Sequence, residues 1–379
     1  MRDAVVITSE GNVLEVEQWA SVWLGEAWRA AGIGEREPER LLQMEVVVRA
    51  SNRPSADGLA ALAALRRVAA PDDFAVLDGT VEILSEDQPP PSWFEAPAFE
   101  AVRAWRAVDV WDSERVLFVE YGGPAPHSLV AQISLAGGVL VQKLAVLPPD
   151  AASTWGQLRG QDDIPMPAVE CPVDEVLTEL ADALRTTDMT WPRNDDDEFV
   201  NLRALAWSRC RPHLPGIRDW QPMGDAERNQ LLDDFSPPDD TVARSLADLF
   251  LDYGDGYMRS GALFWSPDQV ELLLTYWLPR KAVLDAEQRA ALPDVLRRWI
   301  RFALERRGVD PRWISPVVEA VDTHLAEFNE SFDDTVTWGP AKQITAELAA
   351  RGVDLSDEGA VGDAMRRLNA ERLARHLLE

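Results

Sequence analysis

The sequence predicts an α+β fold that is predominantly α-helical, with a small antiparallel β-meander beside N-terminal helices and a multihelical domain after it. Two observations indicate this class. Three short runs rich in β-branched residues are joined by glycine-containing turns in the first half of the chain, and almost every later segment has apolar residues at helical spacing. A chain of 379 residues is too long for one ordinary core, so we expect an N-terminal domain over residues 1–146 and a C-terminal domain over residues 147–379.

Three helices are expected near the N-terminus, after a short strand over residues 4–8. Apolar residues recur at helical spacing between residues 16 and 27, which indicates the first helix. Pro38 suits the start of the second helix, and Ser55 can cap the third. Residues 74–84 then alternate in a way that predicts a strand pair around an Asp-Gly turn.

The clearest β signal lies at residues 115–121, 128–135 and 139–146, which predict an antiparallel meander. In the middle strand, alternate residues are expected on a packed face and on a partly wet face. The packed set is Leu129, Ala131, Ile133 and Leu135. Two prolines directly after the last strand mark the domain boundary, and helices are expected throughout the chain beyond them.

A helix over residues 266–278 is expected at the centre of the C-terminal domain. Ser266 is a natural N-cap, and the proline after it fits the first helical position. Because this helix is apolar on nearly all sides, we expect it to be buried, with Leu274 and Trp277 almost inaccessible to solvent. It is expected to end at Pro279, and another buried helix is expected to open at Pro293.

The formal charge is −28, from 37 basic and 65 acidic residues, and it disfavours direct binding of nucleic acid and of anionic membranes. Residues 280–312 depart from this balance, because they contain nine basic and five acidic residues. The candidate anion-binding or partner-binding residues there are Arg280, Lys281, Arg297, Arg298 and Arg301. Either carboxylates of the same chain compensate this segment, or it is a patch for an acidic partner or a phosphorylated ligand. We expect internal compensation, with Arg297 and Arg301 reaching the same neighbour.

No motif for metal or cofactor chemistry is present in the sequence. The four histidines lie in four different predicted elements, and only two cysteines occur, so no zinc spacing is formed. Neither glycine-rich phosphate-binding pattern occurs, and no nucleophile elbow occurs. The sequence therefore predicts no metal site and no cofactor. His127 enters a strand after a glycine-containing turn, where it either acts as an acid or base or makes one backbone hydrogen bond.

The longest apolar runs are too short to cross a bilayer, and the opening residues lack the apolar core of a signal peptide. Two cysteines are too few for a disulfide framework, which agrees with a reducing compartment. We therefore expect a cytoplasmic protein that does not contact membranes.

Three tryptophan-containing segments carry a resemblance that covers about the last third of the chain. They are Trp265-Ser266-Pro267, Trp277-Leu278-Pro279-Arg280-Lys281 and Trp338-Gly339-Pro340-Ala341-Lys342. These segments resemble parts of uncharacterised proteins predicted from high-GC bacterial genomes, and the resemblance implies no activity.

These observations favour a cytosolic, non-catalytic interaction or regulatory protein that acts through a protein partner or through self-association. Helical stripes rich in tryptophan can supply the anchors that protein interfaces use, and the usual catalytic constellations are missing. One alternative is an enzyme with an active site between the domains, built from His127 and dispersed carboxylates. Another is a protein whose acidic surface imitates nucleic acid.

Overall fold

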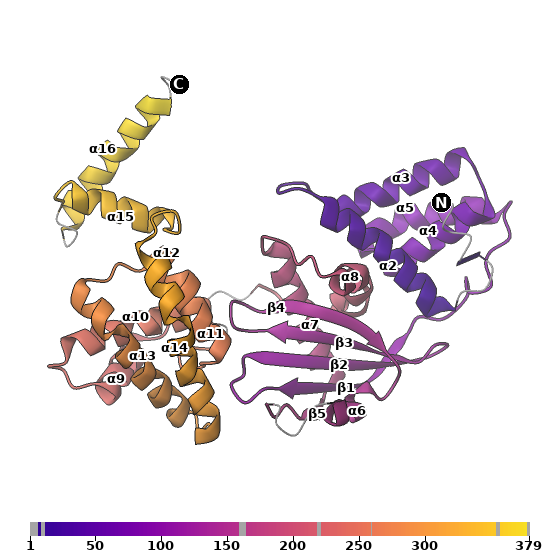
Figure 1. Cartoon of the computed structure of the whole chain (residues 1–379). Helices are drawn as coiled ribbons and strands as arrows, with labels where there is room; N and C mark the ends of the chain where they lie inside the picture. Colours follow the sequence, from indigo (N-terminus) through magenta and orange to yellow (C-terminus); the bar gives the residue numbers. More distant parts are fainter. Residues whose placement is uncertain are drawn as a thin grey trace. The chain divides into compact units, whose positions relative to one another are not determined.

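The computed structural model describes residues 7–8, 12–158, 164–217, 221–258, 260–353 and 357–376. The chain is mostly helical, at 61%, with one five-stranded antiparallel sheet and a multihelical C-terminal region, which confirms the predicted fold class. It divides into two compact units, Met1–Trp220 (unit 1) and Gln221–Glu379 (unit 2), coloured from indigo to pink and from pink to yellow in Figure 1.

Unit 1 begins with the three predicted helices, α2 (Val13–Ala30), α3 (Pro38–Asn52) and α4 (Ala56–Val68). Side chains cap two of them. The Asn12 side chain accepts from two backbone N–H groups at the start of α2, and the Ser55 hydroxyl accepts from the Gly58 N–H at 3.1 Å at the start of α4. Of the strand predicted over residues 4–8, residues 4–6 lie outside the described residues, and residues 7 and 8 are helical.

The strand pair predicted at residues 74–84 is wrong. These residues form helix α5 (Phe74–Ser85), which follows the short 3₁₀ helix η2 (Pro71–Asp73). Leu77 and Leu84 are seven residues apart, so they share one face of the helix, and both are buried where α5 packs on α4. Tertiary packing therefore makes this segment a helix, although its local alternation of residues predicts strands.

The sheet has the strand order β4-β3-β2-β1-β5 (Figure 1). The strands are β1 (Glu100–Val108), β2 (Glu114–Gly122), β3 (His127–Ser134), β4 (Leu140–Leu147) and β5 (Ala168–Cys171). Strands β2 to β4 are the predicted meander, whereas β1 was not predicted. Strand β5 contradicts the expectation that only helices follow residue 147. It has four residues and pairs antiparallel with β1, so a tertiary contact forms it, not a local pattern.

One face of the sheet is covered by α7 (Val173–Met189) and α8 (Asp197–Cys210). The predicted packed set of the middle strand is buried in this core, which confirms that alternation. Helix α6 (Ala151–Leu158) contributes Trp155 to a smaller cluster with Phe118 of β2, at a ring distance of 5.5 Å. Because α7 and α8 pack on the sheet, unit 1 extends to Trp220, and the boundary predicted after residue 146 falls inside this unit.

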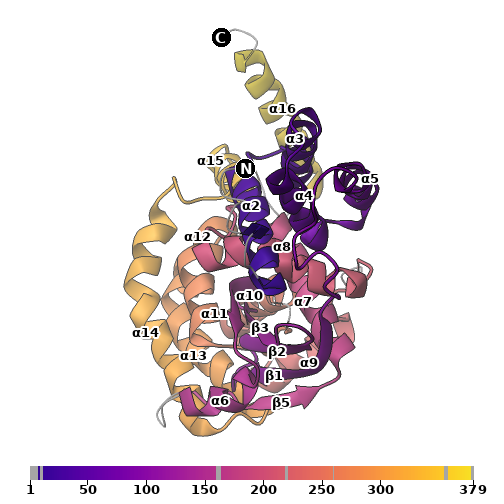
Figure 2. The same cartoon turned by 90° about the vertical axis from the view of Figure 1, so that its right-hand side faces the viewer.

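All regular secondary structure in the described part of unit 2 is helical. Its elements are α9 (Asp225–Phe235), α10 (Thr241–Tyr257), α11 (Pro267–Glu271), the π-helical η4 (Leu272–Trp277), α12 (Leu278–Lys281), α13 (Ala286–Arg306), α14 (Pro311–Asp333), α15 (Pro340–Ala350) and α16 (Glu358–His376). Helices α13 and α14 run side by side in both views (Figure 1 and Figure 2). As predicted, Ser266 caps the central helix, and Leu274 and Trp277 are buried, at 0% and 8% exposure.

Two predicted helix boundaries in unit 2 are wrong. The central helix does not end at Pro279, because the chain passes through the π turn into α12 and stays helical to Lys281. Helix α13 starts before Pro293, because Asp285 and Gln288 form a capping box that satisfies the first turn seven residues earlier. Pro293 then lies inside the helix, where it removes one backbone donor but does not stop the chain.

Candidate functional site

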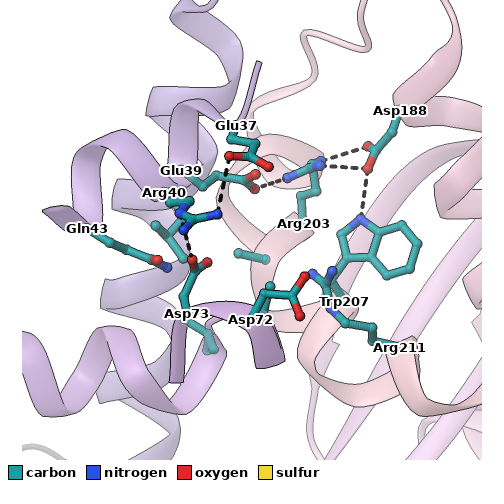
Figure 3. A pocket seen from close by; sticks show the side chains of 14 residues that line it. Glu37, Glu39, Arg40, Gln43, Asp72, Asp73, Asp188, Arg203, Trp207 and Arg211 are labelled. Atoms are coloured by element: carbon teal, nitrogen blue, oxygen red, sulfur yellow. Dashed lines mark hydrogen bonds and ion pairs between the residues drawn. The ribbon is translucent and has the colours of Figure 1, made fainter. Parts of the chain in front are cut away.

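Unit 1 contains a polar cavity of about 280 Å³, which we call the acidic pocket (Figure 3). Five carboxylates and three guanidinium groups line it, so its charge is unbalanced towards the acidic side. Its walls come from the start of α3, from η2, from the end of α7 and from α8 with the short 3₁₀ helix η3 (Arg211–His213). The charged and aromatic residues are Glu37, Glu39, Arg40, Asp72, Asp73, Asp188, Arg203, Trp207 and Arg211.

One wall of the acidic pocket is a closed network around Arg203, whose side chain is 6% exposed. Arg203 donates to both carboxylate oxygens of Asp188, at 2.8 and 2.6 Å, and also donates to Glu39. The indole of Trp207 donates to the same Asp188 at 2.9 Å. Burial acts against the charge of Arg203, but the two carboxylates outweigh it and raise the pKa of the guanidinium above its ordinary value. This wall is therefore satisfied internally.

The opposite wall is held less tightly. Arg40 lies 3.5 Å from the carboxylates of both Glu37 and Asp73, which is long for a charge-assisted hydrogen bond. Burial raises the pKa of Asp73, and the charges of Asp72 and Glu37 add to this effect, although Arg40 opposes it. This side of the pocket thus holds more negative charge than its arginine neutralises.

Two polar side chains of the acidic pocket lack a partner among the described residues. The amide oxygen of Gln43 has none, although the residue is only 1% exposed, and its amide points into the pocket in Figure 3. Arg211 lies over the ring of Trp207 at 5.0 Å, and no described carboxylate lies within ion-pair distance of it. Burial lowers the pKa of Arg211 from its ordinary value. Buried polar groups are usually paired, so both groups are available to a ligand.

The arrangement favours a ligand with a positive, donor-rich group. The carboxylates and the Gln43 amide oxygen are acceptors, and the Nε of Arg211 is a buried donor without a hydrogen-bond partner among the described residues. No group of three or more histidine, cysteine, aspartate or glutamate residues suited to a metal ion occurs in the part of the chain that the structure describes.

The basic segment predicted as a candidate site lies in unit 2 and is largely paired within that unit. Arg297 donates to Asp294 at 2.7 Å and also to Asp322, and Arg298 lies 3.8 Å from Asp240. Arg301 is exposed and has no ion pair with any described residue, whereas Arg297 pairs with Asp294 and Asp322. Contrary to the prediction, the two arginines do not share a neighbour. The two side chains therefore differ, although they are four residues apart on α13.

Arg280 and Lys281 lie at the end of α12 and pack over Tyr276 and Tyr257, at 4.7 and 5.9 Å from the ring centres. Two of the segments that carry the resemblance meet at this point. The Gly339 N–H donates to the Arg280 carbonyl at 3.0 Å, and Lys342 donates to the preceding carbonyl, that of Pro279, at 2.8 Å. A Cβ atom on Gly339 would lie 2.7 Å from the Arg280 carbonyl oxygen, so this close approach requires glycine. Gly339 and Lys342 thus satisfy two of the C-terminal carbonyls of α12.

His127 lies in the core of unit 1 at 2% exposure and lines neither the acidic pocket nor the second cavity of this unit, described below. Its Nδ1 is 2.9 Å from the Ala125 carbonyl oxygen, and its ring stacks on Tyr121 at 5.2 Å. Burial lowers the pKa of His127. Of the two roles considered for His127, this environment agrees with a histidine that makes one backbone hydrogen bond.

No residue of the acidic pocket carries a signal of a binding site in the sequence. The charged runs around Pro38 and Pro71 both precede helices, where acidic residues are common as favourable partners of the helix dipole. No local signal shows that these two helix starts face α8.

Comparison of the chain with protein-family models, with curated proteins and with solved structures finds no significant match. The similarity to uncharacterised proteins of high-GC bacterial genomes therefore remains a prediction. Among the described helices, none combines the length and the apolar character that a membrane crossing requires.

Proposed function

We propose that this protein is a non-catalytic interaction protein, and that its acidic pocket receives an arginine or lysine side chain of a protein partner. The observation that carries this proposal is the surplus of two carboxylates in a cavity with an unpartnered, buried Gln43 amide oxygen. A guanidinium or ammonium group supplies the missing charge and donors. Arg211 can then donate to a backbone carbonyl of the same segment, which favours a peptide over a small cation.

Exposed apolar residues on the elements that line the pocket favour a protein as the source of this side chain. Leu41 follows Arg40 on α3, and Val76 follows shortly after Asp73 at the start of α5. Each helix repeats the pattern seven residues later, at Val48 and Ile83. All four are exposed, and α3 contacts α5. Apolar side chains around a charged anchor are typical of protein interfaces.

A direct test uses calorimetric titration with N-acetyl-arginine methylamide and with its neutral citrulline counterpart. The arginine compound should bind in saturable fashion and the citrulline compound at least about tenfold more weakly, because only the first brings a charge. Asp72→Asn with Asp73→Asn should abolish the difference, whereas Asp87→Asn, an exposed aspartate outside the pocket, should preserve it. Equal binding of the two compounds, or no binding of either, contradicts the proposal.

The partner itself can be sought by cross-linking in a lysate of the source organism. A true partner should be captured by the native chain and by Asp87→Asn, and lost with both the pocket double variant and Leu41→Glu. A protein captured equally by all four chains does not use this surface. We place the interaction in the cytoplasm, a location that the two free cysteines, Cys171 and Cys210, support.

A further inference from the structure

A second cavity of unit 1, of about 380 Å³, has the opposite charge balance from the acidic pocket. Three arginines line it, Arg66, Arg67 and Arg209, whereas Glu17 is the one carboxylate in its described lining. Arg66 pairs with Asp78, which lies outside this lining, at 2.6 Å, so the surplus charge rests on Arg67 and Arg209. We call it the arginine cavity. In a chain with a formal charge of −28, a cavity with a surplus of guanidinium groups stands out.

Glu17 holds two of these guanidinium groups in place. It is 2% exposed, and its two oxygens accept from Arg67, at 2.9 Å, and from Arg209. The two terminal nitrogens of Arg67 donate hydrogen bonds to the carbonyls of Ala96 and Pro97, at 3.0 and 3.1 Å. Each nitrogen of Arg67 therefore makes one hydrogen bond, and the single charge of Glu17 cannot neutralise both arginines.

Arg209 retains unused donor capacity. Its side chain is 8% exposed, its Nε has no hydrogen-bond partner among the described residues, and its other terminal nitrogen has only a long 3.5 Å contact to the Ser208 hydroxyl. Tyr121 also lines the cavity, and its buried hydroxyl likewise has no partner. The guanidinium carbon of Arg209 lies 5.3 Å from the centre of the Tyr121 ring, so the two side chains pack against each other in the lining of the cavity.

The remaining walls are apolar. Phe99 and Leu177 line the cavity, and Arg209 also lies over the ring of Phe99 at 4.9 Å. A positive centre with spare N–H groups beside apolar walls suits a ligand with an anionic head and a compact apolar body. We propose that the arginine cavity binds a small organic anion, a carboxylate or a phosphate ester, with Arg209 as the anchor and Tyr121 as a second donor.

Calorimetric titration of the full chain tests this with benzoate, phenyl phosphate and inorganic phosphate, and with neutral benzamide as the uncharged control. Benzoate or phenyl phosphate should bind in saturable fashion, more tightly than benzamide and inorganic phosphate. A preference between the two organic anions shows which head group the cavity takes. Tyr121→Phe should weaken binding of the preferred anion by about tenfold without loss of folding, because that hydroxyl has no hydrogen-bond partner among the described residues. Tyr276→Phe, an exposed tyrosine of unit 2, is the matched control and should change nothing.

A second pair of variants separates charge from shape. Ser208→Asp places a carboxylate beside Arg209 and should abolish anion binding, whereas Ser208→Asn has nearly the same shape without the charge and should retain it. Asp72→Asn in the acidic pocket should leave anion affinity unchanged, so failure of this proposal is distinct from failure of the first. The proposal is overturned if neither organic anion binds, if benzamide binds equally well, or if Ser208→Asp and Ser208→Asn behave alike.

Discussion

The acidic pocket and the arginine cavity lie against different faces of the same helix, α8, and the surplus charges of their linings have opposite signs. Arg203 and Trp207, four residues apart on one face, contribute to the acidic pocket. Ser208 and Arg209 contribute to the arginine cavity. At about 100° of helical rotation per residue, they are turned by roughly 140° and roughly 240° from Arg203. One helix thus separates a site with surplus carboxylates from a site with surplus guanidinium groups.

The difference lies in where the surplus charge is placed. In the acidic pocket, the buried Arg203 is satisfied by two carboxylates, and Asp72 and Glu37 hold the surplus where solvent reaches them. In the arginine cavity, the single carboxylate is buried, and two guanidinium groups depend on it. The first site should therefore tolerate loss of one carboxylate, whereas the second should not. Each of the following predictions tests or sharpens this contrast.

The largest effect on the free energy of unfolding is expected for a substitution of Glu17. Glu17→Gln leaves Arg67 and Arg209 close together and without a carboxylate, and removal of one partner from a buried pair typically costs about 3–5 kcal/mol. Glu39→Gln in the acidic pocket is the matched change, and it should cost clearly less because Arg203 keeps Asp188. Urea unfolding measures both. Equal losses would remove the distinction between the two sites.

A smaller effect on the free energy of unfolding is expected for the exposed arginines in the basic segment of unit 2. Arg297→Gln should lower the free energy of unfolding by about 0–1 kcal/mol, because Arg297 pairs with Asp294 and Asp322 at the surface. Arg301→Gln should leave it nearly unchanged, because no described carboxylate pairs with Arg301. If Arg301→Gln proves the more damaging of the two, the internal pairing described for this segment does not stabilise it.

The smallest effect concerns the pH dependence of the acidic pocket. The pKa of Asp73 in the folded chain is raised above its ordinary value of 3.8, so the folded state holds this proton more tightly than the unfolded state does. The stability that protonation contributes is therefore fully present below pH 3.8 and is lost as the pH rises through the folded pKa. Asp73→Asn should stabilise the chain slightly near pH 7, and the gain should shrink below pH 4. Thermal unfolding over this range measures the gain, and a variant that is less stable near pH 7 would show that Arg40 outweighs burial.

Much of the fold could be predicted from the sequence because its signals are local. The caps at Ser55 and Ser266 lie within a few residues of the N–H groups that they satisfy. The meander was recognisable from β-branched runs and turns, and the burial of Leu274 and Trp277 from helical periodicity. The errors at α5, at β5 and at the start of α13 fall where packing or a cap outweighed local propensity.

The candidate sites depend on contacts that no local pattern records. Arg203 reaches Glu39 across 164 positions of the chain, and Arg209 reaches Glu17 across 192. Both contacts arise because α8 packs against the N-terminal helices, which brings their charged side chains to the two faces of α8. By itself, the sequence determined the composition, the charge, the class of fold and most helix starts, since these follow from neighbouring residues. Only the tertiary structure decided which charges face each other, because the free energy of a buried charge depends on partners that folding brings near.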